Sequence, residues 1–268
     1  MEDENATTPV MTVEGSIVTI RLNRPTKLNR IEPADLRTLA DHLAVIEAQS
    51  DQRVLVLTGT GRVFSAGYHL GDLSERRAGN GDDDRRDGSP EAGNLFETVV
   101  NALEACRIPT ICALNGSVYG GATDLALACD FRVGILGTEL VMPAAKLGIH
   151  YYRGGMERYV TRLGLNAAKK LFLTALPIKA EELVSMGYLT EAVSKDEHSG
   201  YVAALAEQLA ANAPLSTQNM KRALNQIARN ALDEHAFANG YRACMESADL
   251  AEGLRAWKEK RSPQFEGR

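Results

Sequence analysis

Two glycine-containing segments could supply backbone N–H groups to a negatively charged oxygen. They are residues 63–70, with the sequence VFSAGYHL, and residues 113–125, with the sequence ALNGSVYGGATDL. Each reads as the end of a strand, a turn of small residues and the start of a helix, where the first N–H groups have no intrahelical partner and lie at the positive end of the helix dipole. Two such groups that converge on one point form an oxyanion hole, which stabilises an enolate or a tetrahedral intermediate. Taken singly, each segment is more typical of an ordinary tight turn.

The elements that would position these segments alternate between strands and helices. Residues 54–58 and 109–113 are short apolar runs, typical of strands that are buried on both faces. Apolar residues within 31–49 recur at spacings of three and four, as on an amphipathic helix. From Gly155 onward the pattern is mainly helical. Strands that alternate with helices, followed by helices alone, predict an α/β core with a helical C-terminal region.

The remaining elements follow from the same patterns and from turn signals. A hairpin is expected where the β-rich runs 10–13 and 17–22 flank a Glu-Gly-Ser turn. Further strands are expected at 131–135 and 139–142, and helices at 95–105, 123–129, 156–163, 167–174, 179–186, 198–211, 214–230, 235–246 and 249–260. Residues 74–93 read as a mobile surface loop of mixed charge. A metal site at its three consecutive aspartates is the weaker alternative, because charge runs are usually solvated.

The composition is that of an ordinary globular protein, with 268 residues, 44% hydrophobic and 24% charged. A net charge of −5 gives no global field to hold nucleic acid or an anionic membrane, and no apolar run is long enough to predict a membrane span. The first five residues are acidic and polar, unlike a secretory or mitochondrial leader, so we expect a cytoplasmic protein. The four cysteines form no Cys-x-x-Cys pair and are expected to be buried thiols rather than zinc ligands or disulfides.

Taken together, the ordered motifs resemble the crotonase (enoyl-CoA hydratase/isomerase) superfamily over nearly the whole chain. The motifs are Arg24-Pro25 with Asn29, residues 64–67, residues 115–130, Pro143 with residues 147–149, Gly154-Gly155 with Arg158, and the tail 252–265. The resemblance implies an α/β fold, a crotonase-like spiral of ββα units over residues 1–195 that carries the coenzyme A and oxyanion site. It also implies that residues 196–268 form a helical region that assembles a homotrimer or a pair of trimers.

The same resemblance implies an acyl-CoA thioester as substrate and no separate cofactor, because coenzyme A is part of the substrate. By position, the N–H groups of Tyr68 and Gly121 would hold the thioester carbonyl oxygen. Lys27, Leu28 and Lys260, the last from its own or a neighbouring subunit, would contact coenzyme A, with ordinary surface charge as the alternative for the lysines. The other residues expected at the substrate site are Ala66, His69, Leu70, Gly120, Ala144 and Tyr152.

The acid and base residues are where this chain departs from the hydratases. Those enzymes use two glutamates to place a water and to move its proton. Asp124 stands at the first of these positions, as in the similar dienoyl-CoA isomerases, and helix N-terminal charge complementarity is its alternative role. Ala144 stands at the second position and cannot carry a proton. Glu139 and Glu157 are possible substitutes, although neither matches that position.

Residues 150–152 are His-Tyr-Tyr, where most hydratases have small residues and a proline. This stretch resembles the methylmalonyl-CoA decarboxylases, which have a tyrosine matching Tyr151 and also lack the second glutamate. Those enzymes have a histidine at the position of Tyr68, whereas here His69 follows one residue later. Alternatively, Tyr151 and Tyr152 only line the wall of the pocket, and His69 makes a structural hydrogen bond.

We therefore expect an acyl-CoA-processing enzyme that stabilises a thioester enolate, with Asp124 and Tyr151 handling protons. Decarboxylation of a malonyl-type thioester or double-bond isomerisation suits Ala144 better than hydration, because neither needs a second carboxylate to activate water. A non-catalytic acyl-CoA-binding protein that keeps the fold is the alternative from another class. A nucleic-acid-binding relative is disfavoured, because no basic stripe with interleaved aromatics is present.

Overall fold

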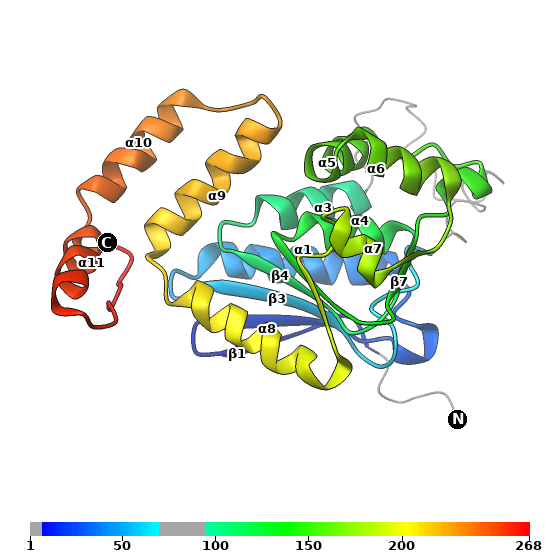
Figure 1. The fold of residues 1–268 in the computed structure, drawn as a ribbon, viewed down its shortest axis with the longest axis horizontal. Coiled ribbons are helices and arrows are strands. Elements are labelled where there is room, and N and C mark those ends of the chain that lie inside the picture. The colour runs from blue at the N-terminus through cyan, green and yellow to red at the C-terminus, as the bar shows by residue number, and fades with distance from the viewer. Residues whose placement is uncertain (1–6, 70–94) are drawn as a thin grey trace.

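A twisted sheet forms the centre of the molecule in the computed structural model, which describes residues 7–69 and 95–268 (Figure 1). Within the described residues this sheet has six strands, in the order β1 (Val10–Glu14), β2 (Ile17–Leu22), β3 (Val54–Gly59), β4 (Thr110–Leu114), β6 (Phe131–Ile135) and β9 (Glu191–Val193). β1 and β2 pair as an antiparallel hairpin, and the strands from β2 to β9 are parallel. Parallel strands end at the same edge of a sheet, so the turns after β3 and β4 are brought side by side.

A smaller sheet lies beyond that edge. It is formed by β5 (Val118–Tyr119), β7 (Glu139–Val141) and β8 (Ile178–Lys179). β5 and β7 are parallel, and β8 is antiparallel to β7. β5 directly precedes the helix that carries the second glycine segment, so this sheet fixes where that helix begins.

Helices cover both faces of the large sheet, which explains why β3 and β4 are buried along their whole length. On one face lie α1 (Pro33–Ala48), α3 (Leu95–Ala105) and α4 (Gly121–Ala128), whose apolar side chains share a core with β2 and β3. α5 (Arg153–Leu163) packs against α4. On the other face, α8 (Lys195–Ala210) packs Val202 and Ala206 against Val54, Ile111 and Val133.

Local sequence accounts for where several helices begin. Pro33 occupies the first turn of α1, where its missing N–H costs no hydrogen bond. Glu32 and Asp35 form a reciprocal capping box at the same end. Ser194 caps α8 by accepting a hydrogen bond from the Glu197 N–H group.

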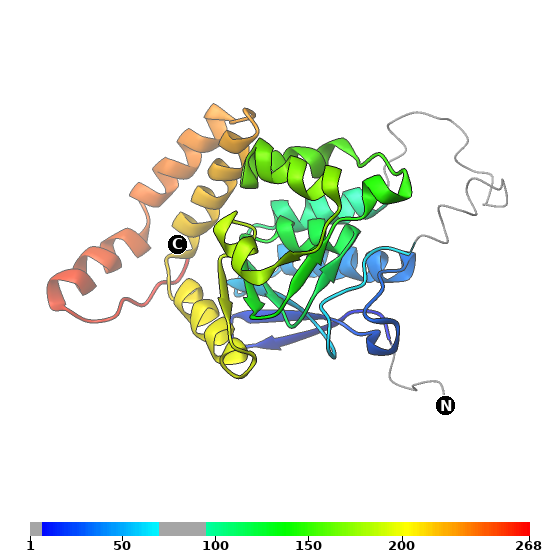
Figure 2. The ribbon, with the colours of Figure 1, turned by 45° about the vertical axis from the view of Figure 1, so that its right-hand side comes forward.

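The C-terminal helices stand to one side of the sheet (Figures 1 and 2). They are α9 (Pro214–Ala228), α10 (Glu234–Met245) and α11 (Ala248–Glu259). Several large apolar side chains of α9 and α10 are exposed, including Met220, Leu224, Phe237 and Tyr241. Neighbouring exposed apolar side chains of this kind often mark a contact surface.

The α/β architecture with a helical C-terminal region is confirmed, and most predicted elements appear within three residues of their expected bounds. The predicted strand at 139–142 ends at Val141, and the predicted helix at 167–174 is divided into α6 (Leu165–Lys169) and a π-helical turn (Lys170–Thr174). β5, β8 and β9 were not expected, because strands of two or three residues are too short to show a periodic pattern. The loop expected at 74–93 lies outside the described residues.

Candidate active site

The two glycine segments meet at the edge of the large sheet. Ser65 and Val118 form a parallel bridge, and the Tyr119 N–H group donates to the Ser65 carbonyl at 3.0 Å. The backbones approach so closely that a Cβ atom on Gly67 would lie 2.6 Å from the Tyr119 carbonyl oxygen. Gly67 also has a φ of +94°, so glycine is needed there both for space and for backbone conformation.

This contact makes Tyr68 and Gly121 neighbours. A Cβ atom on Gly121 would lie 3.4 Å from the Tyr68 Cβ atom. Gly121 is the first residue of α4, where backbone N–H groups have no acceptor within the helix. The preceding Gly120 N–H group is already bonded to the Val141 carbonyl at 2.9 Å. The two residues whose N–H groups were predicted to act together are therefore side by side.

Two asparagines hold the loop that leads from β3 to Tyr68. Asn29 Nδ2 lies 2.8 Å from the Thr60 carbonyl oxygen and 3.1 Å from that of Phe64. Asn115 Oδ1 accepts the Gly59 N–H at 3.1 Å, and its amide group donates to the Gly61 carbonyl at 2.8 Å. Both asparagines belong to the motifs found in the sequence, and their role here is to shape backbone that has no regular partner.

Asp124 lies in the first turn of α4 and is fully buried. Its Oδ1 atom is 2.7 Å from Nη1 of Arg158, which is also fully buried. Its Oδ2 atom accepts a hydrogen bond from the Tyr152 hydroxyl and one of 3.3 Å from the Tyr151 hydroxyl. The structure thus gathers three predicted site residues and adds Arg158, which the sequence had marked only as part of a motif.

Gly155 makes room for this cluster. A Cβ atom at that position would lie 2.8 Å from Asp124 Oδ2 and would overlap the Tyr151 ring. Gly155 is in the first turn of α5, three residues before Arg158. The second glycine of the Gly-Gly motif is therefore required because α5 passes directly over the Asp124 carboxylate.

Burial and charge set the protonation states of the cluster. Burial first, and the negative charge of Asp124 second, raise the pKa values of the Tyr151 and Tyr152 hydroxyls, so both remain protonated at neutral pH. Burial of Arg158 opposes its charge, but Asp124 and Glu104 outweigh that cost and raise the pKa of the guanidinium. Neutral phenols and a charged arginine therefore surround the carboxylate.

Aromatic rings connect the two halves of the site. The Tyr68 and Phe96 ring centroids are 5.6 Å apart, those of Phe96 and Tyr152 are 6.2 Å apart, and those of Tyr152 and Tyr151 are 4.7 Å apart. The Phe96 ring also lies 3.1 Å from the place where a Gly121 Cβ would be. Sequence reasoning missed Phe96, because it is one of several apolar residues on the buried face of α3.

The sequence profile of enoyl-CoA hydratases/isomerases matches residues 12–268. The chain belongs to the enoyl-CoA hydratase/isomerase family. The expected enzyme class, lyases and isomerases that act on acyl-CoA thioesters, is confirmed at the level of this family.

Relatives with assigned names cover almost the whole chain. A short-chain-enoyl-CoA hydratase of Clostridium acetobutylicum is 29% identical over 255 residues, which is 94% of this chain and 95% of the relative. A 1,2-epoxyphenylacetyl-CoA isomerase of Escherichia coli is 31% identical over 262 residues, 96% of this chain and 97% of the relative. The crystal structure of an enoyl-CoA hydratase from Bacillus anthracis has a TM-score of 0.85 at 30% identity and covers 98% of this chain and 100% of that one.

Ala144 is the residue that the family resemblance places at the second glutamate position of the hydratases. Its side chain is buried at the start of a short 3-10 turn (Ala144–Leu147). Glu139 instead accepts a hydrogen bond of 3.0 Å from the Tyr119 hydroxyl, and Glu157 pairs with Arg153 at 2.6 Å. Both glutamates that sequence reasoning considered as substitutes are thus engaged with other side chains.

The residues expected to contact coenzyme A are only partly brought together. Leu28 adjoins the first glycine segment, because its carbonyl accepts the Ala66 N–H at 2.8 Å. Lys27 is exposed and pairs with Glu32 at 3.5 Å. Lys260 follows α11, which lies far from α4 in both ribbon views, so within one chain it does not join the other residues.

His69 and Leu70 are the two remaining residues that were predicted at the substrate site. His69 is half-buried, and its backbone N–H group donates to the Ile31 carbonyl at 2.9 Å. Leu70 lies outside the described residues.

Among residues 7–69 and 95–268, no group of three or more His, Cys, Asp or Glu side chains could hold a metal ion. No helix in those two ranges is long and apolar enough to cross a membrane.

Proposed function

We propose that this chain converts an acyl-CoA thioester through an enolate held by the N–H groups of Tyr68 and Gly121. The observation that supports this most directly is the close approach of the two glycine segments. As the enolate forms, negative charge moves onto the thioester oxygen, where two N–H donors and the positive end of the α4 dipole favour it. Loss of one such donor typically slows a reaction by about 10²–10³-fold.

Proton transfer falls to Tyr152, Tyr151 and Asp124. The Tyr152 oxygen can accept a proton from the acyl group while its own proton moves along the hydrogen bond to Asp124 Oδ2, and the reverse transfer returns a proton to carbon. In an isomerisation, a proton leaves one carbon and returns to another. In a decarboxylation, the bond to the carboxyl carbon breaks, its electron pair enters the enolate and CO2 leaves. The α-carbon then takes the proton of the Tyr152 hydroxyl, and a proton from solvent restores that hydroxyl.

Hydration is the less favoured reaction of the family for this chain. It needs a carboxylate that is free to bind and deprotonate water, and Ala144 offers none. Asp124 is already bonded to Arg158 and to both tyrosine hydroxyls. These contacts support isomerisation of a 3-enoyl thioester or decarboxylation of a malonyl-type thioester.

The test is to supply the purified protein with crotonyl-CoA, a 3-enoyl-CoA and a malonyl-type CoA, and to follow product mass. We expect turnover of the second or third substrate, loss of that turnover in Asp124→Asn and Tyr152→Phe, and full activity in Tyr201→Phe, which changes an exposed tyrosine of α8. Rapid addition of water to crotonyl-CoA that Asp124→Asn abolishes would instead establish a hydratase that uses one carboxylate.

A binding protein without turnover is the second candidate. The complete pairing of the Asp124 carboxylate favours it, because a fully bonded acceptor can be purely structural. Tight binding of acyl-CoA in calorimetry, with no product from any of the three thioesters, would support this alternative and overturn the catalytic proposal.

We also propose that α9 and α10 contact further copies of the chain in a homotrimer or a pair of trimers. Leu224 is 65% exposed and Tyr241 is 62% exposed, so an apolar face points away from the protein's own core. Light scattering should report an oligomer for the native chain and a smaller species for Leu224→Glu. A monomeric native chain at micromolar concentration would contradict this.

A further inference from the structure

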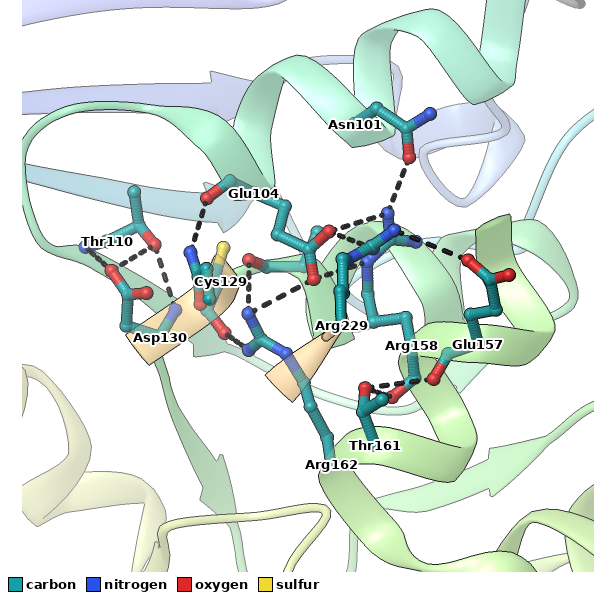
Figure 3. A network of polar contacts seen from close by, with 12 residues as sticks. Asn101, Glu104, Thr110, Cys129, Asp130, Glu157, Arg158, Thr161, Arg162 and Arg229 are labelled. Atoms are coloured by element: carbon teal, nitrogen blue, oxygen red, sulfur yellow. Dashed lines mark hydrogen bonds and ion pairs between the residues drawn. The ribbon is translucent and has the colours of Figure 1, made fainter. Parts of the chain in front are cut away.

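Glu104, at the end of α3, connects several arginines from different helices (Figure 3). Its Oε1 atom is 3.1 Å from Arg158 Nε and 3.5 Å from Arg162 Nη2. Its Oε2 atom accepts hydrogen bonds from Arg158 at 3.3 Å and from Arg229. Glu104 is buried, so these charges meet in a region where water screens them poorly.

Arg158 links Glu104 to Asp124 in the candidate active site. Its Nη1 atom bonds Asp124 at 2.7 Å, and its Nη2 atom bonds the Asn101 side-chain oxygen at 2.8 Å. Since the guanidinium is planar and rigid, the position of Glu104 on one side constrains the position of Asp124 on the other. Carboxylates and guanidiniums thus alternate from Arg229 through Glu104 and Arg158 to Asp124.

Arg229 connects the C-terminal helices to this row of alternating charged side chains. It follows α9 directly, and Lys221 and Asn225 precede it at intervals of four residues, on the same side of the helix. Lys221 pairs with Asp130 at 2.7 Å, and Asn225 bonds the Glu104 carbonyl at 3.1 Å. α9 therefore docks on its own core through a polar stripe, one end of which touches Glu104.

We propose that Glu104 and Arg229 are positioning residues for the active-site carboxylate: through Arg158, they set where Asp124 meets the hydroxyls of Tyr151 and Tyr152. This inference rests on the proposed role of Asp124. Without Glu104, Arg158 keeps only one carboxylate partner and turns fully toward Asp124. Without Arg229, Glu104 loses a cation and draws Arg158 away from Asp124.

The experiment compares variants that all touch α9 or its docking site. Glu104→Gln and Arg229→Gln each remove one charged group from the row that runs from Arg229 to Asp124. Lys221→Gln is the matched control, because it removes an ion pair of the same polar stripe that does not reach Glu104. Conservative variants, Glu104→Asp and Arg229→Lys, test for rescue. Each is assayed for kcat and KM with the thioester that the native chain converts, and for melting temperature.

A positioning role predicts that Glu104→Gln and Arg229→Gln lower kcat by about 2- to 30-fold with little change in KM, the range found for residues that act through a network. Arg229→Lys should recover part of the loss, and Lys221→Gln should keep the native kcat even if its melting temperature falls. If kcat instead falls in parallel with melting temperature in Glu104→Gln, Arg229→Gln and Lys221→Gln alike, only the docking of α9 matters and the proposal is wrong.

A second readout does not depend on turnover. In protein labelled with 13C at tyrosine Cζ, the NMR signal that Tyr152→Phe removes reports the hydrogen bond to Asp124. Arg229→Gln should shift this signal and Lys221→Gln should leave it in place. An unchanged Tyr152 signal in both Arg229→Gln and Glu104→Gln would overturn the inference, even if the native chain converts no thioester. If Glu104→Gln does not fold, the result for Arg229→Gln alone is decisive.

Discussion

The Arg158 guanidinium lies 2.7 Å from the Asp124 carboxylate, and both side chains are fully buried. The pair belongs to two helices, α4 and α5, that are separated by strands and turns in the sequence. An ion pair of this kind holds the carboxylate in one orientation. Removal of either side chain should lower the free energy of unfolding strongly, because the other would keep a buried charge.

A double-mutant cycle on this pair should give a strong coupling. We expect Asp124→Asn to lower the free energy of unfolding by about 3 kcal/mol, since it leaves Arg158 with Glu104 as its remaining carboxylate. Urea unfolding of Asp124→Asn, Arg158→Met and the double variant measures the coupling. The same cycle on Arg153 and Glu157, an exposed pair, should give only about 0.3–0.5 kcal/mol. Equal couplings for the two pairs would contradict a role for burial.

Gly155→Ala should disturb the site because its Cβ would meet Asp124 Oδ2 and the Tyr151 ring. We expect a loss of about 1–3 kcal/mol in the free energy of unfolding and a marked loss of kcat. Gly200→Ala is the matched control, because Gly200 is also helical and a Cβ there meets nothing within 4 Å. That variant should be as stable as the native chain or more stable by up to about 1 kcal/mol. Native kcat in Gly155→Ala would show that α5 can move away without harm.

Gly67→Ala separates backbone strain from crowding in the first glycine segment. Gly67 and Gly137 both have positive φ angles, +94° and +88°, so alanine strains the backbone at either position by about 1–2 kcal/mol. Only at Gly67 does the new Cβ also meet a backbone atom, the Tyr119 carbonyl oxygen at 2.6 Å. Thermal unfolding and thioester turnover should therefore show a larger destabilisation and a loss of activity for Gly67→Ala alone. Similar behaviour of the two variants would argue against the close approach.

The charge of Glu104 should make stability depend on pH. Burial raises the pKa of Glu104, but Arg158, Arg162 and Arg229 outweigh it, so the pKa is lowered in the folded protein. A carboxyl group whose pKa is lowered on folding contributes stability above its unfolded pKa of about 4.3 and loses that contribution as the pH falls through the folded value. Glu104→Gln should therefore cost the most at pH 7 and progressively less below about pH 4, as measured by urea unfolding. A cost that does not change with pH would contradict this.

The sequence by itself determined the family, the α/β core and the residues that approach one another at the two glycine segments. These features rest on local signals: apolar runs, glycines at turns, and motifs such as Asn29 and Asn115 that shape adjacent loops. Such signals act over a few residues or along one strand and its turn, so they can be seen without knowing the fold. Asp124, Tyr151 and Tyr152 were predicted as separate site residues from the family resemblance rather than from periodicity, and only the structure shows that they form one cluster.

Only the tertiary structure decided what these residues touch. Arg158 reaches Asp124 across 34 positions of the chain, and Arg229 reaches Glu104 across 125. Phe96 joins the two halves of the site although nothing distinguishes it from its apolar neighbours on α3. Partners of buried charges and rings depend on how helices pack against the sheet, and that packing results from many weak contacts at once, which no single stretch of sequence records.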